Sequence, residues 1–525
     1  MRFKMLKNHL SHTIPCVCYG ILCGALTGTT IFLFKLAATY AEEFSRFLYD
    51  TAKTSPVYIA LCFLVLIGLA FLMAAIHKKA PECKGGGIPR SEGILRGALP
   101  FRHFRTLLGT FFGSLISFFA GVPVGSEGPA VLIGTSIGKI TGSPFRNQVA
   151  WDRYVMTGGA GAGFAVATGA PLSGILFALE EIHKRFSPLL ILTVSMSVLS
   201  ATFTNHLLCD AFHISPNLFE ISVFPALELK YLGYFLLLAL LIAVAVGIFD
   251  VSILLFRRFT VHSKNKSIFP VKLIVVFMLT GILGLTFTDG VYSGHHLVAH
   301  IFSHSMGLGL LIVLFLIRLV MMLLITDSGV TGGIFIPTLA IGALASAIIT
   351  KLLVLLGMPE ELCVIAIFLG MCAFIGGTLR APLTACVLFL ELSGQFTNLL
   401  FVAIVMFGVS FITELFHLTP FYDTALEEMT EAHQQGKTPT ISSFRLTVSE
   451  DAFVVGKAVR DIMWPHASVI TGISHLNHGE EMDDGEQRLY AGDTITLRAR
   501  YFEKDEILQL LEGLVGTEYP IEIKD

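Results

Sequence analysis

The stretch Gly125-Ser126-Glu127-Gly128-Pro129-Ala130-Val131-Leu132-Ile133-Gly134 joins a glycine- and proline-rich turn to an apolar run. The end of this stretch is echoed further along the chain by Pro337-Thr338-Leu339-Ala340-Ile341-Gly342. A second echo, at nearly the same offset, pairs Ala170-Pro171-Leu172-Ser173 with Ala381-Pro382-Leu383-Thr384, and each member leads to a glutamate, Glu180 or Glu391. Two similar halves with interrupted helices at corresponding places indicate a repeat-built transporter, with its site at the repeat interface.

The composition predicts an all-α polytopic membrane protein. The chain has 525 residues, of which 54% are hydrophobic and 14% charged, against roughly 25% charged in soluble domains. The apolar runs are each long enough, or nearly so, to cross a hydrocarbon core about 30 Å thick. They lie near 14–36, 56–76, 105–120, 188–208, 232–256, 268–288, 306–325, 337–357 and 398–417. Shorter pieces at 121–141, 158–182 and 362–393 are interrupted by Gly and Pro, which predicts broken helices.

The chain divides into a large apolar part and a small polar one. We expect a membrane transport domain over 1–427, with the boundary between its repeats near 210–230, and a linker over 428–443. The remainder, 444–525, alternates in short strand-like runs before an amphipathic helix, which predicts a small α+β domain. Basic residues before the first apolar run place the N-terminus in the cytoplasm, and the C-terminal domain with it. A net charge of -3 gives no reason to expect a nucleic-acid partner.

Three turns each open an apolar helix. They are Gly85-Gly86-Gly87-Ile88-Pro89, Gly125-Ser126-Glu127-Gly128-Pro129 and Gly332-Gly333-Ile334-Phe335-Ile336-Pro337. The first amides of a helix lack internal partners and carry partial positive charge, so they attract anions. Several partial charges hold an anion weakly enough to release it, whereas a full buried cation holds it too tightly for transport. A single such turn is more often only a kink, but three in one chain favour an anion cage.

Glu127 lies within the second turn, in apolar surroundings where an ionised carboxylate is costly unless something compensates it. The amides of a helix start would do so. The carboxylate can then compete with the transported anion and leave when protonated, which makes it a candidate gate and proton carrier. The alternative is a glutamate that simply caps the first turn of its helix.

Glu180 and Glu181 end an apolar run and precede Lys184 and Arg185. Adjacent acids on a helix point in different directions, so one can face the interior while the other meets the basic cluster. Glu181 is a candidate entry point for protons, and its alternative is a surface carboxylate that balances Lys184 and Arg185. Tyr422 follows the last apolar run; its hydroxyl could donate to an anion, or it could be an interfacial tyrosine.

Other site classes receive little support. His296, His300 and His304 share one spacing of four residues, but no carboxylate or cysteine accompanies them, so we expect no metal site. No phosphate-binding loop of the ATPase type is present, which speaks against direct ATP drive. The sequence therefore predicts a transporter rather than an enzyme.

The three turns, in this order and followed by the Ala-Pro-Leu and double-Glu segment, resemble the CLC family of chloride channels and chloride/proton antiporters. The resemblance covers roughly 15–430. It implies a homodimer in the cell membrane, in which each subunit has its own pathway built from inverted repeats of tilted, broken helices. It implies no cofactor, only bound chloride ions.

Residue by residue, the resemblance makes Glu127 the external gate and Glu181 the internal proton glutamate, with Glu180 assisting. It makes the Tyr422 hydroxyl and the amides of Ile334 and Phe335 ligands of a central anion. The amides of Ser126, Glu127 and Gly128 would then form the outer site, and the first turn contributes through Gly86 and Gly87.

Two positions depart from the family's pattern. Gly86 stands where the family usually carries a serine whose hydroxyl contacts the anion and selects chloride, which leaves the identity of the anion open. Ser126 stands where the family usually carries Lys or Arg, which predicts weaker attraction at the outer mouth. The C-terminal part, through Val455-Gly456-Lys457-Ala458-Val459-Arg460-Asp461 and a turn from Leu489 to Gly492-Asp493, resembles more weakly a regulatory domain of potassium-transport subunits. That resemblance implies an unidentified small ligand.

The sequence thus favours secondary active transport of chloride, or a similar small anion, in exchange for protons, because an acid at Glu181 separates exchangers from most channels of the family. A passive chloride channel is the first alternative. A fluoride/proton antiporter is the second, suggested by Gly86 and opposed by Phe335 and the double Glu. A membrane sensor whose helices only anchor the C-terminal domain is a third, but it needs neither the paired acids nor the three cages.

Overall fold

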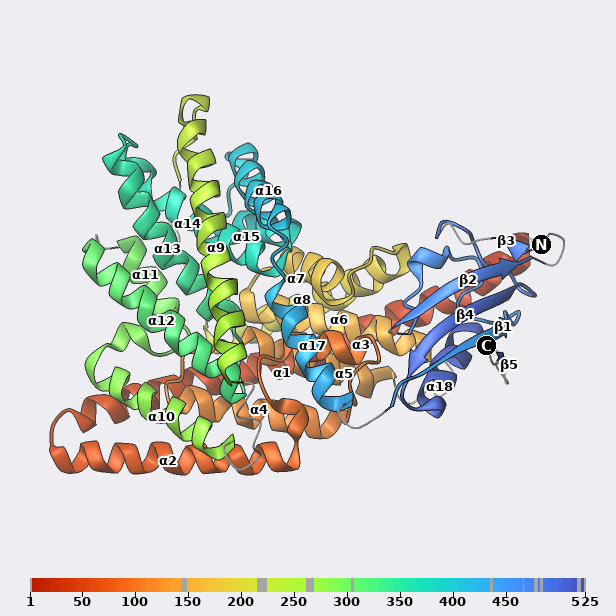
Figure 1. The fold of residues 1–525 in the computed structure, drawn as a ribbon, viewed down its shortest axis with the longest axis horizontal. Helices are drawn as coiled ribbons and strands as arrows, with labels where there is room; N and C mark the ends of the chain where they lie inside the picture. The colour runs from red at the N-terminus through yellow and green to blue at the C-terminus, as the bar shows by residue number, and fades with distance from the viewer. Residues whose placement is uncertain are drawn as a thin grey trace.

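The computed structural model describes residues 2–142, 149–214, 224–260, 269–303, 306–434, 438–465, 467–475, 480–481, 485–516 and 521–523, with side chains from Thr13 onward. Within them the protein is a bundle of helices followed by a small sheet (Figure 1). Seven helices of the described residues are long and apolar enough to cross a membrane. The predicted all-α membrane fold with a small α+β domain is confirmed.

Helices α1 to α8 form the first half. Their bounds are α1 Arg2–Ala52, α2 Pro56–Lys79, α3 Ile88–Leu95, α4 His103–Phe119, α5 Glu127–Gly142, α6 Val149–Thr168, α7 Pro171–Phe177 and α8 Pro188–Phe212. All three expected turns begin helices: α3 begins at the first turn, α5 at the second, and α13 (Phe335–Leu355, in the second half) at the third. Each has its proline within the first turn, where the missing N–H has no partner to lose.

Helices α9 to α16 form the second half, and α17 leads out of it. Their bounds are α9 Leu232–Thr260, α10 Phe269–Thr286, α11 His295–Ser303, α12 Leu308–Ser328, α13 Phe335–Leu355, α14 Cys363–Leu379, α15 Pro382–Ser393, α16 Leu399–Leu415 and α17 Phe421–Gln434. The expected repeat boundary near 210–230 falls between α8 and α9, and 215–223 within it lie outside the described residues. Two expected spans, α4 and α16, are helices of 17 residues, too short for a perpendicular crossing of about 30 Å.

The chain breaks its helical course at two of the places where Gly and Pro predicted broken helices. The backbone turns left-handed at Gly169 (φ 70°) between α6 and α7, and at Arg380 (φ 58°) between α14 and α15. Pro171 and Pro382 then restart the helices. In the first half α7 continues into a π-helical turn over Ala178–Ile182, which carries both Glu180 and Glu181; such turns are frequent at functional sites.

The two halves bond to one another reciprocally. Gly125 and Gly333, which hold corresponding places before Pro129 and Pro337, each donate their N–H to the other's carbonyl at 2.7 Å. Such an exchange, in which i bonds j and j bonds i, is what a two-fold relation produces. Their bridge is antiparallel, so the corresponding segments run in opposite directions, as inverted repeats require.

Helices α5 and α6 pack with unusually close backbones. A Cβ added at Gly134 would lie 2.0 Å from the carbonyl oxygen of Gly159, and one added at Gly163 would lie 2.1 Å from that of Ala130. Glycine at these positions therefore permits the contact. The register is antiparallel and advances one turn at a time, so the start of α5 lies opposite the end of α6.

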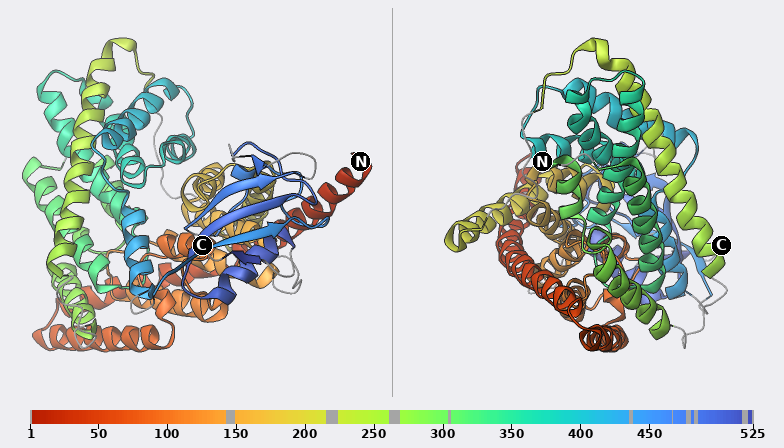
Figure 2. Two further views of the ribbon diagram at one scale, coloured as in Figure 1. Left: turned by 45° about the vertical axis from the view of Figure 1, so that its right-hand side comes forward. Right: turned by 90° about the vertical axis from the view of Figure 1, so that its left-hand side faces the viewer.

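The C-terminal domain is a five-stranded sheet in the order β3-β2-β4-β1-β5, with α18 (Lys504–Val515) against it. The strands are β1 Thr440–Thr447, β2 Ser468–Ser474, β3 Glu480–Glu481, β4 Thr494–Tyr501 and β5 Ile521–Ile523. The first part of the expected linker, 428–434, is helical because α17 runs on to Gln434, and 435–437 lie outside the described residues. Figure 2 shows the domain beside the helices of the first half, and both termini lie at this end of the molecule (Figure 1).

Candidate anion and proton pathway

The three turns meet at one point. Gly125 and Gly333 bridge the second and third turns, and the N–H of Gly85 donates to the carbonyl of Gly329 at 3.2 Å. A Cβ added at Gly128 would lie 1.9 Å from the carbonyl oxygen of Gly86, so the first and second turns are in direct backbone contact. Three helix starts, at which amides lack partners within the helix, therefore lie together.

Side chains fix the first turn to the third. The Thr331 hydroxyl donates to the Cys83 carbonyl at 3.0 Å and lies 2.8 Å from Nε2 of His77. The Ser117 hydroxyl donates to the Thr331 carbonyl at 2.6 Å. Because these groups are buried, their bonds are costly to break, and the turns are held in a single arrangement.

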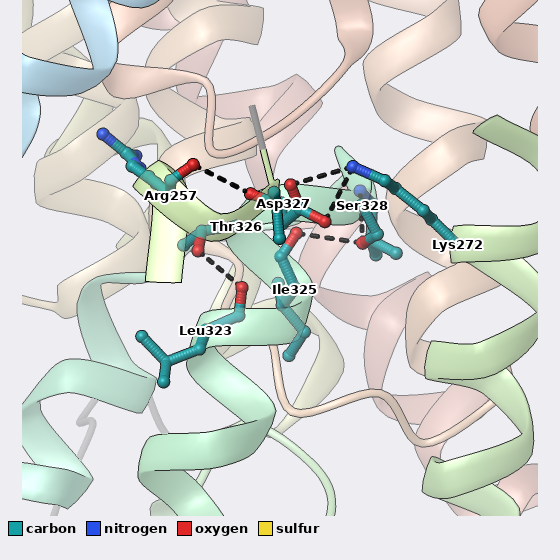
Figure 3. A network of polar contacts seen from close by, with 9 residues as sticks. Arg257, Lys272, Leu323, Ile325, Thr326, Asp327 and Ser328 are labelled. Atoms are coloured by element: carbon teal, nitrogen blue, oxygen red, sulfur yellow. Dashed lines mark hydrogen bonds and ion pairs between the residues drawn. The ribbon is translucent and has the colours of Figure 1, made fainter. Parts of the chain in front are cut away.

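The end of α12 is anchored just before the third turn (Figure 3). Lys272 of α10 reaches Asp327 at 2.9 Å, and the hydroxyls of Thr326 and Ser328 donate to the carbonyls of Leu323 and Ile325. The helix closes at Gly329 in the left-handed region (φ 69°). The chain then enters Gly332 and Gly333 from a fixed direction.

Glu127 is fully buried at the first position of α5. Its Oε1 accepts from the Ser126 hydroxyl at 3.3 Å, and its carboxylate folds over Gly125, where an added Cβ would lie 2.4 Å from Oε2. In the described structure Oε2 is buried without a hydrogen-bond partner. The carboxylate thus lies at the meeting point of the turns, with one of its oxygens unbonded.

Tyr422 is fully buried at the start of α17, and its hydroxyl has no hydrogen-bond partner among the described residues. It interacts electrostatically with both Glu127 and Glu181. A buried phenol of this kind needs an acceptor. Phe335, the first residue of α13, packs edge-on against Phe164 at 5.0 Å between ring centroids, which fixes that helix start.

Glu181 is buried on the π-helical turn, with Oε1 unpartnered among the described residues. Nearby, Lys184 pairs with Glu92 at 3.0 Å and with Asp423 at 2.5 Å, so the basic cluster has other acids to balance it. The alternative in which Glu181 is a surface carboxylate is therefore wrong: the side chain is 3% exposed.

Glu180 faces the second half instead. It accepts hydrogen bonds from the N–H groups of Leu383 and Thr384, at 3.1 and 2.7 Å, and from the Thr384 hydroxyl at 2.7 Å. Glu391 does the same for Leu172 and Ser173 of the first half. Each acid caps the partner half's restarted helix, a structural task that sequence reasoning missed although the echo contained both residues.

A cavity of about 660 Å³ leads to the meeting point from the side of α17. Its walls include Gly86 and Ile334, together with the basic residues Lys84, Arg90 and Arg257. The walls also hold Glu82 and Glu428, the second 3.5 Å from Arg257, so the three cations outnumber the two acids and favour the arrival of anions at the mouth. Sequence reasoning missed them, although Lys84 and Arg90 flank the first turn directly.

The C-terminal domain is hydrogen-bonded to α6 and to the segment that follows Glu181. Arg185 donates to the carbonyls of Arg460 and Ile462 at 2.6 and 2.8 Å, and Arg153 donates to that of Met463 at 2.9 Å. Lys457 lies 2.8 Å from the centre of the Phe453 ring, its ammonium without a hydrogen-bond acceptor among the described residues. Burial lowers the pKa of Lys457 to about 7.

The histidine series does not form a metal site among the residues described. His296 and His300 lie on α11, and His304 lies outside the described residues. In the part of the chain that the structure describes, no group of three His, Cys, Asp or Glu could hold a metal ion.

The comparisons with known proteins agree with this geometry. Residues 68–414 match the family model of the voltage-gated chloride channels. The H(+)/Cl(-) exchange transporter ClcA of Vibrio cholerae serotype O1 (strain M66-2) is 31% identical over 426 residues, which are 78% of this chain and 88% of that protein.

Solved structures share the fold. A slow cyanobacterial Cl-/H+ antiporter has a TM-score of 0.74 at 27% identity, over 80% of this chain and 99% of that one. A CLC-type fluoride/proton antiporter has a TM-score of 0.62 at 19% identity, over 77% of this chain and 96% of that one, which shows a common fold alone.

Proposed function

The chain belongs to the voltage-gated chloride channel family, and from this premise we propose that it exchanges chloride for protons across the cell membrane. The observation that carries the proposal is the pair of buried acids. Glu127 lies where the three turns meet, Glu181 lies on the π-helical turn, and Tyr422 interacts with both. A channel has no use for a second buried acid at Glu181.

Chloride binds, in this proposal, to partial charges rather than to buried cations. The amides of Ile334 and Phe335 and the hydroxyl of Tyr422 hold the central ion. The amides of Ser126, Glu127 and Gly128 form the outer site, which the Glu127 carboxylate occupies in the closed state. Gly86 and Gly87 line the inner approach. Protonation of Glu127 neutralises its carboxylate, so the group leaves and an anion takes its place.

Protons travel between Glu127 and Glu181, the first serving the outer side and the second the inner side. Glu180 assists as a fixed negative charge, because its carboxylate is held by the helix that it caps. The two adjacent acids thus have different roles: Glu181 moves protons, and Glu180 positions a helix.

A liposome assay that records anion and proton flux together tests the proposal. Wild-type protein should drive protons uphill when given a chloride gradient. Glu127→Gln should retain chloride flux and lose proton movement, and Glu181→Gln should block proton movement. Chloride flux without proton movement in the wild type would identify a passive channel. Faster efflux of fluoride than of chloride from loaded vesicles would identify a fluoride/proton antiporter.

The C-terminal domain, 444–525, acts in this proposal as a cytosolic regulatory module that binds a small ligand, and both termini are cytoplasmic. Its support is the contact of Arg185 and Arg153 with the domain, because Arg185 follows Glu181 by four residues. Arg185→Gln should alter proton coupling more than chloride flux. A chain that ends after α17 and still transports would exclude a sensor whose helices only anchor the domain.

The protein also assembles, we propose, as a homodimer with one pathway in each subunit, surrounded by membrane lipid. Mixed dimers of wild type and Glu127→Gln test this. Independent pathways predict half of the wild-type proton flux, whereas a shared pathway predicts a value well below half.

A further inference from the structure

Position 126, directly before the gate, carries a serine and no charge, yet a cation lies close by in space. Lys35 comes from α1, about ninety positions earlier in the chain, and is partly buried within a helix long and apolar enough to span a membrane. Its ammonium donates to the carbonyl of Val166, in the last turn of α6, at 3.2 Å. A lysine in such surroundings is rare and needs a reason.

The packing of α5 on α6 places Val166 opposite Glu127. The close contacts join Gly138 to Val155, Gly134 to Gly159 and Ala130 to Gly163, so each step of four residues along α5 moves four residues back along α6. Continued through the first turn of α5, this register sets Glu127 against Val166. The residue whose carbonyl receives the lysine is thus the neighbour of the gate.

Electrostatics point the same way. Lys35 and Glu127 interact with one another as opposite charges. No carboxylate forms an ion pair with Lys35 among the described residues, so its charge is not cancelled at contact distance. The other titratable groups that interact with one or other of the two are Glu42 on α1, Cys209 on α8, His295 on α11 and Tyr422 on α17.

We infer that Lys35 supplies, from α1, the positive charge at the outer end of the pathway that position 126 lacks, and that it positions the gate electrostatically: it attracts anions to the outer site and favours the ionised form of Glu127. This inference rests on the proposed exchange of chloride for protons. In this inference Lys35 compensates in part for the weaker attraction at the outer mouth that Ser126 predicts.

A plainer role must be separated from this one. The last carbonyls of a helix lack partners, and lysine commonly binds them, so Lys35 could serve only to cap α6. The two roles differ in what they need: a cap needs a hydrogen-bond donor, whereas an electrostatic role needs a charge. Glutamine keeps a donor without the charge, arginine keeps both, and methionine keeps neither.

The experiment measures chloride/proton exchange in liposomes for wild type, Lys35→Arg, Lys35→Gln and Lys35→Met, with gluconate as the replacement anion. We expect Lys35→Arg to resemble wild type. Lys35→Gln and Lys35→Met should both raise the external chloride concentration at half-maximal rate roughly 3- to 10-fold, the effect of one charge at an effective dielectric constant near 20. Both should also shift the acid-activated limb of the pH profile toward higher pH, because the gate protonates more readily without the cation.

Two further variants complete the test. Lys53→Met, in the turn that follows the same helix, removes an exposed lysine paired with Asp50 and should change neither quantity. Lys35→Gln combined with Ser126→Lys should restore both, because the charge returns beside the gate. If Lys35→Gln behaves as wild type while Lys35→Met does not, the lysine is only a cap and the inference is overturned; unchanged Lys35→Met overturns it also. A wild type that exchanges no chloride for protons would instead contradict the proposed function.

Discussion

Glu127 in the first half and Phe335 in the second half hold corresponding positions, each two residues before the proline of its turn. Both begin a helix, α5 or α13, at the point where the turns meet. One presents a loosely bonded carboxylate, and the other an aromatic ring packed on Phe164. The same comparison repeats deeper in each half, where Glu181 follows Glu180 but Leu392 follows Glu391.

The contrast separates acids that hold the two halves together from acids that we propose move protons. Glu180 and Glu391 are present in both halves and bond the opposite half in the same way, so they belong to the scaffold. Glu127 and Glu181 occur in the first half alone and each has an unpartnered oxygen in the described structure. In the proposed function, the groups that move protons therefore belong to one half of a symmetric frame, and mutations should sort into the two classes.

The largest effect should come from Gly87→Ala. Gly87 has a φ of 80°, and an added Cβ would lie 2.3 Å from the carbonyl oxygen of Gly128, which cannot move without displacing α5. We expect a loss of stability of about 3 kcal/mol or more, and loss of transport. Thermal unfolding in detergent and the flux assay measure it. Gly68→Ala, at a position with open space around the added Cβ, is the control; equal behaviour of the two variants would contradict the close approach of the turns.

Next in size are Glu180→Gln and Glu391→Gln. Each removes a charge from a carboxylate that caps the restarted helix of the opposite half, which should cost about 1–3 kcal/mol. Because the halves are equivalent here, the two losses should be similar. Glu181→Gln should leave stability nearly unchanged and stop proton movement. If Glu180→Gln lowers proton coupling more than Glu391→Gln at equal stability, the assisting role of Glu180 is upheld; equal coupling would reduce it to a cap.

Much of this helical arrangement could be predicted from the sequence, because the turns and breaks depend on residues that are close together in the chain. The turns that open α3, α5 and α13, and the breaks before Pro171 and Pro382, follow from the backbone preferences of Gly and Pro within apolar runs. The sequence therefore predicted the broken helices and the three turns that open α3, α5 and α13. What it could not predict depends on partners distant in the chain: the reciprocal caps of Glu180 and Glu391, and the bond of Lys35 to the carbonyl of Val166. Such contacts follow only once helix packing sets the register.

A smaller effect is expected of Gly86→Ser, which tests whether position 86 helps to select the transported anion. A Cβ added at Gly86 meets nothing closer than 3.7 Å, the distance to Cγ1 of Ile334, so the serine fits without strain. Its hydroxyl would be a new donor on the inner approach, worth about 1 kcal/mol for an anion that accepts from it. We expect chloride flux relative to fluoride flux to rise several-fold at unchanged thermal stability. An unchanged ratio would mean that position 86 does not contact the anion.

The smallest effect concerns the C-terminal domain, which hydrogen-bonds to Arg153 and Arg185 of the first half. Lys457 has its pKa lowered by burial to about 7, from an ordinary value of 10.5. Below pH 7 the ammonium is charged whether or not it is buried, so the whole cost of burying it applies. As the pH rises from 7 toward 10.5 the buried amine is neutral while the unfolded chain still binds a proton, so stability rises with pH.

Lys457→Met should therefore stabilise the protein at pH 7, and its advantage over wild type should shrink at pH 9. The upper limit is about 1.4 kcal/mol for each pH unit, and we expect less because part of the side chain meets solvent. Melting temperatures of both proteins at the two pH values measure this. Lys504→Met, which removes an exposed lysine bonded to Glu522, is the matched control, because hydrogen bonding raises the pKa of Lys504 and it stays charged throughout this range. A constant difference between Lys457→Met and wild type would show that the ammonium is solvated, and that the domain rests on the first half without a titrating group at the contact.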